Sequence, residues 1–148
     1  MMPTMEKDFD RWNDTKKDIH ASMHEVYFYE REVWWVHLGV NIGFEQDGTG
    51  EVFERPVVIV KKYNPDVFLA VPLSTTQKIG KYYFHVGEVE GKQATAILSQ
   101  IRLLDVKRLI NRAGTLNTLT FDSLVDALVE ANFKNVGKSS SPPLAGRG

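Results

Sequence analysis

The sequence predicts a mainly β fold with helices, of the α+β class, in which a small twisted β-barrel is preceded by one helix and followed by another. Two observations predict it. Short segments rich in β-branched and aromatic residues recur between turn signals from residue 32 onward. Apolar residues recur at helical spacing in the segments on either side. With 148 residues, the chain can bury a core without disulfide or metal support.

The first segment, residues 1–31, is dense in charge and predicts a short amphipathic helix. Phe9, Trp12, Ile19 and Met23 fall on one approximate helical stripe, with charged residues between them. We therefore expect residues 1–31 to form a helical extension ahead of the barrel.

The barrel domain is expected over residues 32–133. Its predicted strands, in chain order, cover residues 33–38, 56–60, 67–73, 82–86, 95–99 and 109–113. The segment 56–60 is apolar almost throughout, which is typical of a strand covered on both faces. The turn Asn64-Pro65-Asp66 predicts a hairpin between it and the next strand. The glycine-rich residues 41–55 are expected to form a long loop or an irregular hairpin.

An amphipathic helix is expected to end the domain. Thr120 is its expected N-cap, and Phe121, Leu124, Val125 and Leu128 follow at helical spacing. Residues 134–148 contain serine and proline without apolar periodicity and are expected to form a flexible tail.

Composition excludes several classes of protein. The chain has no cysteine, which excludes disulfide scaffolds, zinc–thiolate sites, iron–sulfur clusters and thiol nucleophiles. Eighteen basic against 19 acidic residues exclude a strongly basic nucleic-acid coat protein, although not a local basic groove. Without a signal peptide or a membrane-length apolar run, we expect a soluble cytoplasmic protein without membrane contact. No motif predicts a metal site or a cofactor.

One composite pattern is more specific. Four blocks follow one another in order: Trp34-Trp35-Val36 with the loop Asn41 to Gly48, Arg55-Pro56-Val57-Val58-Ile59, Val71-Pro72-Leu73-Ser74-Thr75, and Ser99-Gln100-Ile101-Arg102. This series resembles the PemK/MazF family of toxin endoribonucleases from type II toxin–antitoxin systems, over about residues 32–130. The resemblance implies an SH3-like barrel that forms a homodimer and needs no metal ion or other cofactor.

The resemblance also implies an activity. Such toxins cut single-stranded RNA, usually mRNA at a short sequence, by attack of the ribose 2′-hydroxyl on the adjacent phosphate. The products carry a 2′,3′-cyclic phosphate and a 5′-hydroxyl. A cognate antitoxin protein blocks the RNA groove.

Three residues are implied at the catalytic centre. Arg55 would stabilise the charge that develops on the phosphate, because a guanidinium stays protonated and its planar fork suits phosphate. Ser74 stands where the family usually has a threonine, and Thr75 is the alternative hydroxyl. Glu45 would orient Arg55 or accept the 2′-hydroxyl proton. The residues alone leave other readings open, in which Arg55 pairs with a neighbouring glutamate, Ser74 caps local backbone and Glu45 is an acid that only solubilises the loop.

Further residues are implied in RNA binding. Gln46 lies in the loop that touches RNA in relatives, and Gln100 lies at a position of base contacts, whereas Arg102 is expected to hold the fold or the dimer. A local positive groove would come from Lys61, Lys62, Lys78 and Lys81. Scattered surface lysines are the alternative.

Two rival functions stay open from the sequence. A gyrase-binding toxin of the CcdB group would use the same barrel without cutting RNA. A catalytically inactive relative that binds RNA or antitoxin is the other, because Ser74 departs from the family threonine. The N-terminal extension and the insertion at residues 49–54 lie outside the usual short toxin, and the extension either supports the domain or shields its groove.

Overall fold

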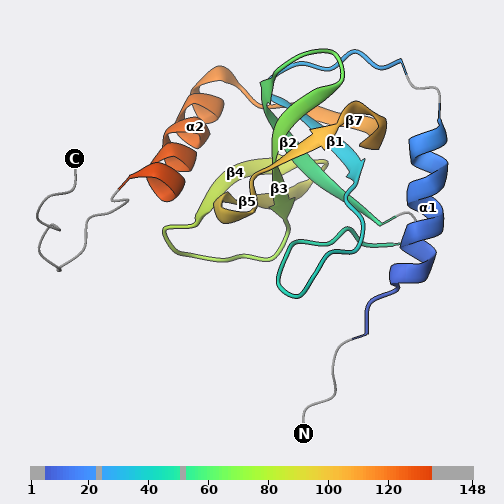
Figure 1. The fold of residues 1–148 in the computed structure, drawn as a ribbon. Helices are drawn as coiled ribbons and strands as arrows, with labels where there is room; N and C mark the ends of the chain where they lie inside the picture. The colour runs from blue at the N-terminus through green and yellow to red at the C-terminus, as the bar shows by residue number, and fades with distance from the viewer. Residues whose placement is uncertain (1–5, 23–24, 51–52, 135–148) are drawn as a thin grey trace, which may run out of the picture.

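The computed structural model describes residues 6–22, 25–50 and 53–134. A curled antiparallel sheet lies between two helices, with α1 on one flank and α2 on the other (Figure 1). The elements in chain order are α1 (Phe9–Ala21), β1 (Glu32–His37), β2 (Glu54–Lys62), β3 (Val67–Ser74), β4 (Tyr83–Val89), β5 (Lys92–Ile97), β6 (Arg102–Asp105), β7 (Leu109–Thr115) and α2 (Thr118–Phe133). Short 3₁₀ turns, η1 (Leu98–Gln100) and η2 (Val106–Arg108), flank β6. The predicted mainly β fold with two helices is confirmed.

The sheet has the order β4-β5-β3-β2-β1-β7, and β6 also pairs with β3. Consequently β3 is bonded to β2 along one edge and to β5 and β6 along the other. The predicted hairpin between β2 and β3 is confirmed, and Asn64 Oδ1 closes its turn by accepting from the Asp66 and Val67 amides.

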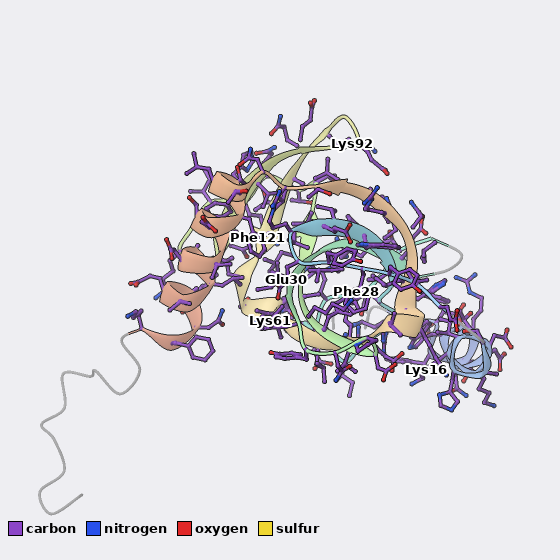
Figure 2. All side chains as sticks on the ribbon, turned by 90° about the horizontal axis from the view of Figure 1, so that it is seen from above. Lys16, Phe28, Glu30, Lys61, Lys92 and Phe121 are labelled. Carbon is purple, nitrogen blue, oxygen red and sulfur yellow. The ribbon has the colours of Figure 1, made fainter. Side chains whose placement is uncertain are left out.

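Two cores lie on opposite faces of the sheet. Alternation along β2 sends Val57 and Ile59 into the interior of the curl and sends Val58 toward α2. Phe28 lies at the centre of the curl, and Phe121 lies between α2 and the sheet (Figure 2). The near-continuous apolar run of β2 is therefore explained by burial on both faces, as predicted.

Three predictions of local structure are wrong. The N-cap of α2 is Asn117, whose Oδ1 accepts from the Thr120 amide, so the helix starts earlier than Thr120. The hairpin of β4 and β5 extends through residues expected in a loop, because Gly87, with φ of 95°, accommodates a bulge within the strand. Strand β6 was not expected, since its four residues alternate too briefly to be recognised.

The predicted N-terminal helix is present as α1, with Trp12 buried and Ile19 half-buried against the barrel. Met23 of the predicted stripe and the predicted tail from residue 135 lie outside the described residues. Among the helices that the structure describes, none is long and apolar enough to span a membrane.

Candidate active site

An open cavity of about 370 Å³ lies where β2 begins and β3 ends, beside the β4–β5 hairpin. Arg55, Ser74 and Thr75 all line it. Two of the three residues predicted for the catalytic centre, together with the alternative hydroxyl, are thus brought together from separate strands.

Strand register explains this meeting. In the β2–β3 ladder Val57 stands opposite Pro72, and continuing the antiparallel pairing by two residues sets Arg55 opposite Ser74. On its other edge Ser74 pairs with Thr95 of β5, which carries the β4–β5 hairpin to the cavity. The cavity is therefore fixed by backbone pairing on both sides of β3.

Arg55 is held by two backbone carbonyls. Its Nε donates to the Asp47 oxygen at 2.6 Å and its Nη1 donates to the Leu73 oxygen at 3.1 Å. Burial lowers the pKa of Arg55, and the Asp47 carboxylate raises it by less. In the described residues Arg55 makes no ion pair, Glu54 included, whereas Glu51 lies outside them. Two of its five N–H groups fix the fork, which leaves the others to bind an anion in the cavity.

Ser74 lies at the rim with its hydroxyl half-exposed. Its Oγ accepts from the Thr76 amide at 3.1 Å, which is the local backbone cap that was left open as an alternative. A hydroxyl that accepts one bond keeps its proton for donation, so the cap and a contact with phosphate are compatible. Thr75 is exposed beside it.

Glu45, Gln46 and Gln100 line a second cavity of about 470 Å³. Gln100 joins its two sides, because its Oε1 accepts from the Gln46 amide at 3.2 Å and its Nε2 donates to the Phe44 oxygen. The Glu45 carboxylate accepts from the Ile42 amide. Glu45 is therefore not brought to the Arg55 cavity, and the acid beside Arg55 is Asp47.

Arg102, which was expected to hold the fold or the dimer, also lines this second cavity. Burial lowers the pKa of Arg102, and the Glu45 charge raises it by less. Burial and the Arg102 charge lower the pKa of Arg108, which Asp105 raises. Both arginines line a further hollow of about 510 Å³ along α1, so two neighbouring cations form a basic strip there.

The predicted lysines lie in two separate places, two at the end of β2, where Lys62 Nζ donates to the Phe28 oxygen, and two in the loop after β3. Lys61 is at the opposite end of β2, roughly 20 Å along the strand from Arg55, and it pairs with Glu30 at 3.8 Å. Figure 2 shows it well separated from Lys92 at the tip of the β4–β5 hairpin. Lys78 and Lys81 lie in the exposed loop after β3, over the rings of Tyr83 and Tyr82.

Sequence reasoning missed several lining residues. Trp35, Glu90 and Lys92 belong to the Arg55 cavity, and Trp35 Nε1 donates to Glu90 Oε2 at 3.2 Å. Alternation along β1 separates the two tryptophans, because Trp34 lies in the core and Trp35 lines the cavity. Glu90 and Lys92 arrive through long-range pairing of β5 with β3, for which the sequence carries no local signal.

Comparison with solved structures shows the same fold. An endoribonuclease in complex with its cognate antitoxin, from Mycobacterial species, matches with a TM-score of 0.54 and 17% identity, covering 79% of this chain and all of that one. MazF from Deinococcus radiodurans matches with a TM-score of 0.56 and 14% identity, covering 71% of this chain and 96% of that one. A search of curated proteins finds no match.

The comparison with family models covers most of the barrel. The model of the PemK-like, MazF-like toxin of type II toxin–antitoxin systems matches residues 29–131, which include β1 to β7, most of α2 and every residue that lines the two cavities. Helix α1 lies outside the match. With the fold in agreement, the chain belongs to the PemK-like, MazF-like family of type II toxin–antitoxin toxins.

Proposed function

We propose that this toxin is a sequence-selective, metal-independent endoribonuclease that cleaves single-stranded RNA. The observation that carries the proposal is the meeting of a fixed guanidinium, Arg55, with the hydroxyls of Ser74 and Thr75 in one open cavity. Family membership supports it, and two fold neighbours are described as endoribonucleases.

The proposed reaction begins when a ribose 2′-hydroxyl attacks the adjacent phosphorus. The bond from phosphorus to the 5′-oxygen breaks, which leaves a 2′,3′-cyclic phosphate and a 5′-hydroxyl. Negative charge builds on the non-bridging oxygens, where a donor held in advance is most effective. Arg55 suits this role, because its carbonyl bonds fix the fork before substrate arrives.

Ser74 would donate a hydrogen bond to the phosphate or to the departing 5′-oxygen, which then takes its proton from solvent. Its bond from the Thr76 amide holds the hydroxyl oxygen and leaves the proton directed elsewhere. Thr75 is the second candidate at the same rim.

The proton of the 2′-hydroxyl needs an acceptor. Glu54 and Glu90 are the carboxylates that line the Arg55 cavity, and Trp35 holds Glu90. We assign the general base to one of these two, because Glu45 lies in the second cavity.

The second cavity would select the neighbouring base. Gln46 and Gln100 offer amide groups that both donate and accept, and the fully exposed ring of Phe44 stands beside them for stacking. Phosphates of the RNA strand that enters the two cavities would be contacted by Arg102, Lys78 and Lys81.

A cognate antitoxin that covers the Arg55 cavity, a homodimeric state and a cytoplasmic site of action complete the proposal. The antitoxin is supported by the fold neighbour that was solved with its own antitoxin. The homodimer and the cytoplasm follow from the family resemblance.

The test is incubation of purified protein with a long single-stranded RNA in EDTA, followed by mapping of the product ends. We expect cuts at a recurring sequence, with 5′-hydroxyl ends, that disappear in Arg55→Ala. Lys17→Ala is the control, since Lys17 is exposed on α1 and its side chain makes no hydrogen bond or ion pair among the described residues. Cleavage that requires added metal would contradict the mechanism. Intact RNA together with inhibited DNA gyrase would favour the gyrase-binding class instead.

A further inference from the structure

The loop of residues 41–48, between β1 and β2, has little apolar anchorage of its own. Ile42 is 77% exposed and Phe44 is fully exposed. Its internal bonds are polar: Asn41 Nδ2 donates to the Gln46 oxygen, and the Gly48 amide donates to the Gly39 oxygen. A segment with so few buried apolar contacts opens easily unless another element holds it.

Lys7, from the N-terminal segment, supplies such a hold. Its Nζ donates to the carbonyl oxygens of Asn41 and Gly43, and it pairs with the Asp47 carboxylate at 3.0 Å. Only 17% of the Lys7 side chain is exposed, so the ammonium is directed to the loop rather than to solvent. One cation therefore ties together three positions of the loop.

Helix α1 holds the same loop at its base. Trp12 is 5% exposed and packs with Val40, which directly precedes the loop, and with Phe53, which directly precedes β2. A Cβ at Gly39, where φ is +83°, would lie 2.3 Å from the Trp12 ring, so the helix is seated directly on the backbone. Figure 1 shows the loop running back toward α1.

The held loop is the one that fixes Arg55. The Asp47 oxygen accepts from Arg55 Nε at 2.6 Å, while the Asp47 carboxylate accepts from the Asn41 amide and from Lys7. Contacts thus run without a gap from Lys7 through Asp47 to the guanidinium. The family match begins at residue 29, so Lys7 and Trp12 lie outside the matched region.

We propose that residues 7–21, the N-terminal brace, position Arg55 for catalysis by holding the loop 41–48. Lys7 is a positioning residue that acts through Asp47. This inference rests on the proposed function of Arg55, and it answers the question of the extension in favour of support rather than shielding.

The test compares Lys7→Gln with Lys17→Gln, a neutralisation on the exposed part of α1 where the structure shows no contact of the side chain. Two readouts are independent of cleavage: hydrogen exchange of the amides in residues 41–48, and exchange of the Arg55 Nε proton followed by NMR. In Lys7→Gln we expect both to quicken at least tenfold, while exchange in β3 is unchanged. Lys17→Gln should match the wild type.

Cleavage of labelled single-stranded RNA supplies the third readout. A small misplacement of a catalytic group can lower the rate by about a hundredfold, so we expect kcat of Lys7→Gln to fall tenfold to about a hundredfold. KM should change less than threefold, because the brace does not touch substrate. Lys7→Arg, which keeps a cation with several donors, should recover part of the lost rate.

The outcomes separate the two proposals. Unchanged exchange of the Arg55 Nε proton in Lys7→Gln would overturn the brace, whether or not the protein cleaves RNA. Faster exchange with unchanged kcat would show that the held loop does not serve catalysis. A wild-type protein that leaves RNA intact would refute the proposed function, and the exchange data would still decide whether Lys7 fixes Arg55.

Discussion

Replacing Arg55 with lysine tests the site most directly, because it keeps the charge and removes the fork. The arginine donates to two carbonyls that lie on different segments, Asp47 in the loop and Leu73 at the end of β3. A lysine ammonium has no planar fork with which to span both while also facing a phosphate. The variant therefore loses the fixed direction of its charge rather than the charge itself.

The magnitude follows from the role. Loss of one preorganised donor to a developing oxyanion lowers kcat by about 10²–10³, or about 2.7–4 kcal/mol. Stability should change far less, by about 1 kcal/mol, because the lysine ammonium can still reach one of the two carbonyls and keeps the charge, so one hydrogen bond is lost.

The assay measures single-turnover cleavage of a short labelled RNA that contains one cut site, alongside thermal unfolding. Lys17→Arg serves as the control exchange of one cation for another at an exposed position whose side chain makes no hydrogen bond or ion pair among the described residues. Cleavage by Arg55→Lys within about threefold of the wild type would refute the reasoning, since a threefold change is far below the expected loss of a fixed donor.

Four further predictions follow from the same geometry. Either Glu54→Gln or Glu90→Gln should lower kcat by about 10²–10⁴ and remove the acidic limb of the pH–rate profile. Small and equal effects of both substitutions would exclude both residues as the general base. Ser74→Ala should abolish most cleavage while Thr75→Ala keeps it, and the reverse result in rate assays would assign the role to Thr75. Arg102→Gln should leave the free energy of unfolding unchanged or raise it, because the substitution removes the repulsion between Arg102 and Arg108. In the same variant, the slope of log K against log salt for RNA binding should fall in magnitude by about 0.7. An unchanged slope would contradict a contact between Arg102 and an RNA phosphate. Gly39→Ala should destabilise the protein by about 2–4 kcal/mol in denaturant titrations, through a left-handed backbone and a clash with Trp12, and a neutral result would refute the seating of α1.

The strands that alternate strongly were predictable from the sequence. The run from Val57 to Ile59 gave β2 and its two-sided burial, and Asn64-Pro65-Asp66 gave the hairpin with β3. Side-chain periodicity and turn chemistry act over a few residues, so a single sequence reveals them. The four residues of β6 were missed because their place is decided by pairing with β3 rather than by their own pattern.

The candidate site divides in the same way. Arg55 and Ser74 were recognised from their blocks, and strand register explains why they meet. The position of Glu90 and Lys92 at the cavity depends on which strands pair, and a single sequence does not reveal this. The bond from Arg55 to Asp47 uses a backbone carbonyl, which every residue type has, so the residue type does not predict it. The resemblance implied Glu45 at the catalytic centre, but the structure places Glu45 at the second cavity.

The double pairing of β3 has a consequence for how this toxin loses activity on heating. Ser74 sits on a strand that is paired along both edges, whereas the Asp47 carbonyl sits on a loop that can detach together with the N-terminal brace while the sheet stays folded. On warming, RNA cleavage activity should therefore be lost several degrees below the temperature at which the sheet unfolds. On cooling, the activity should return without refolding of the sheet.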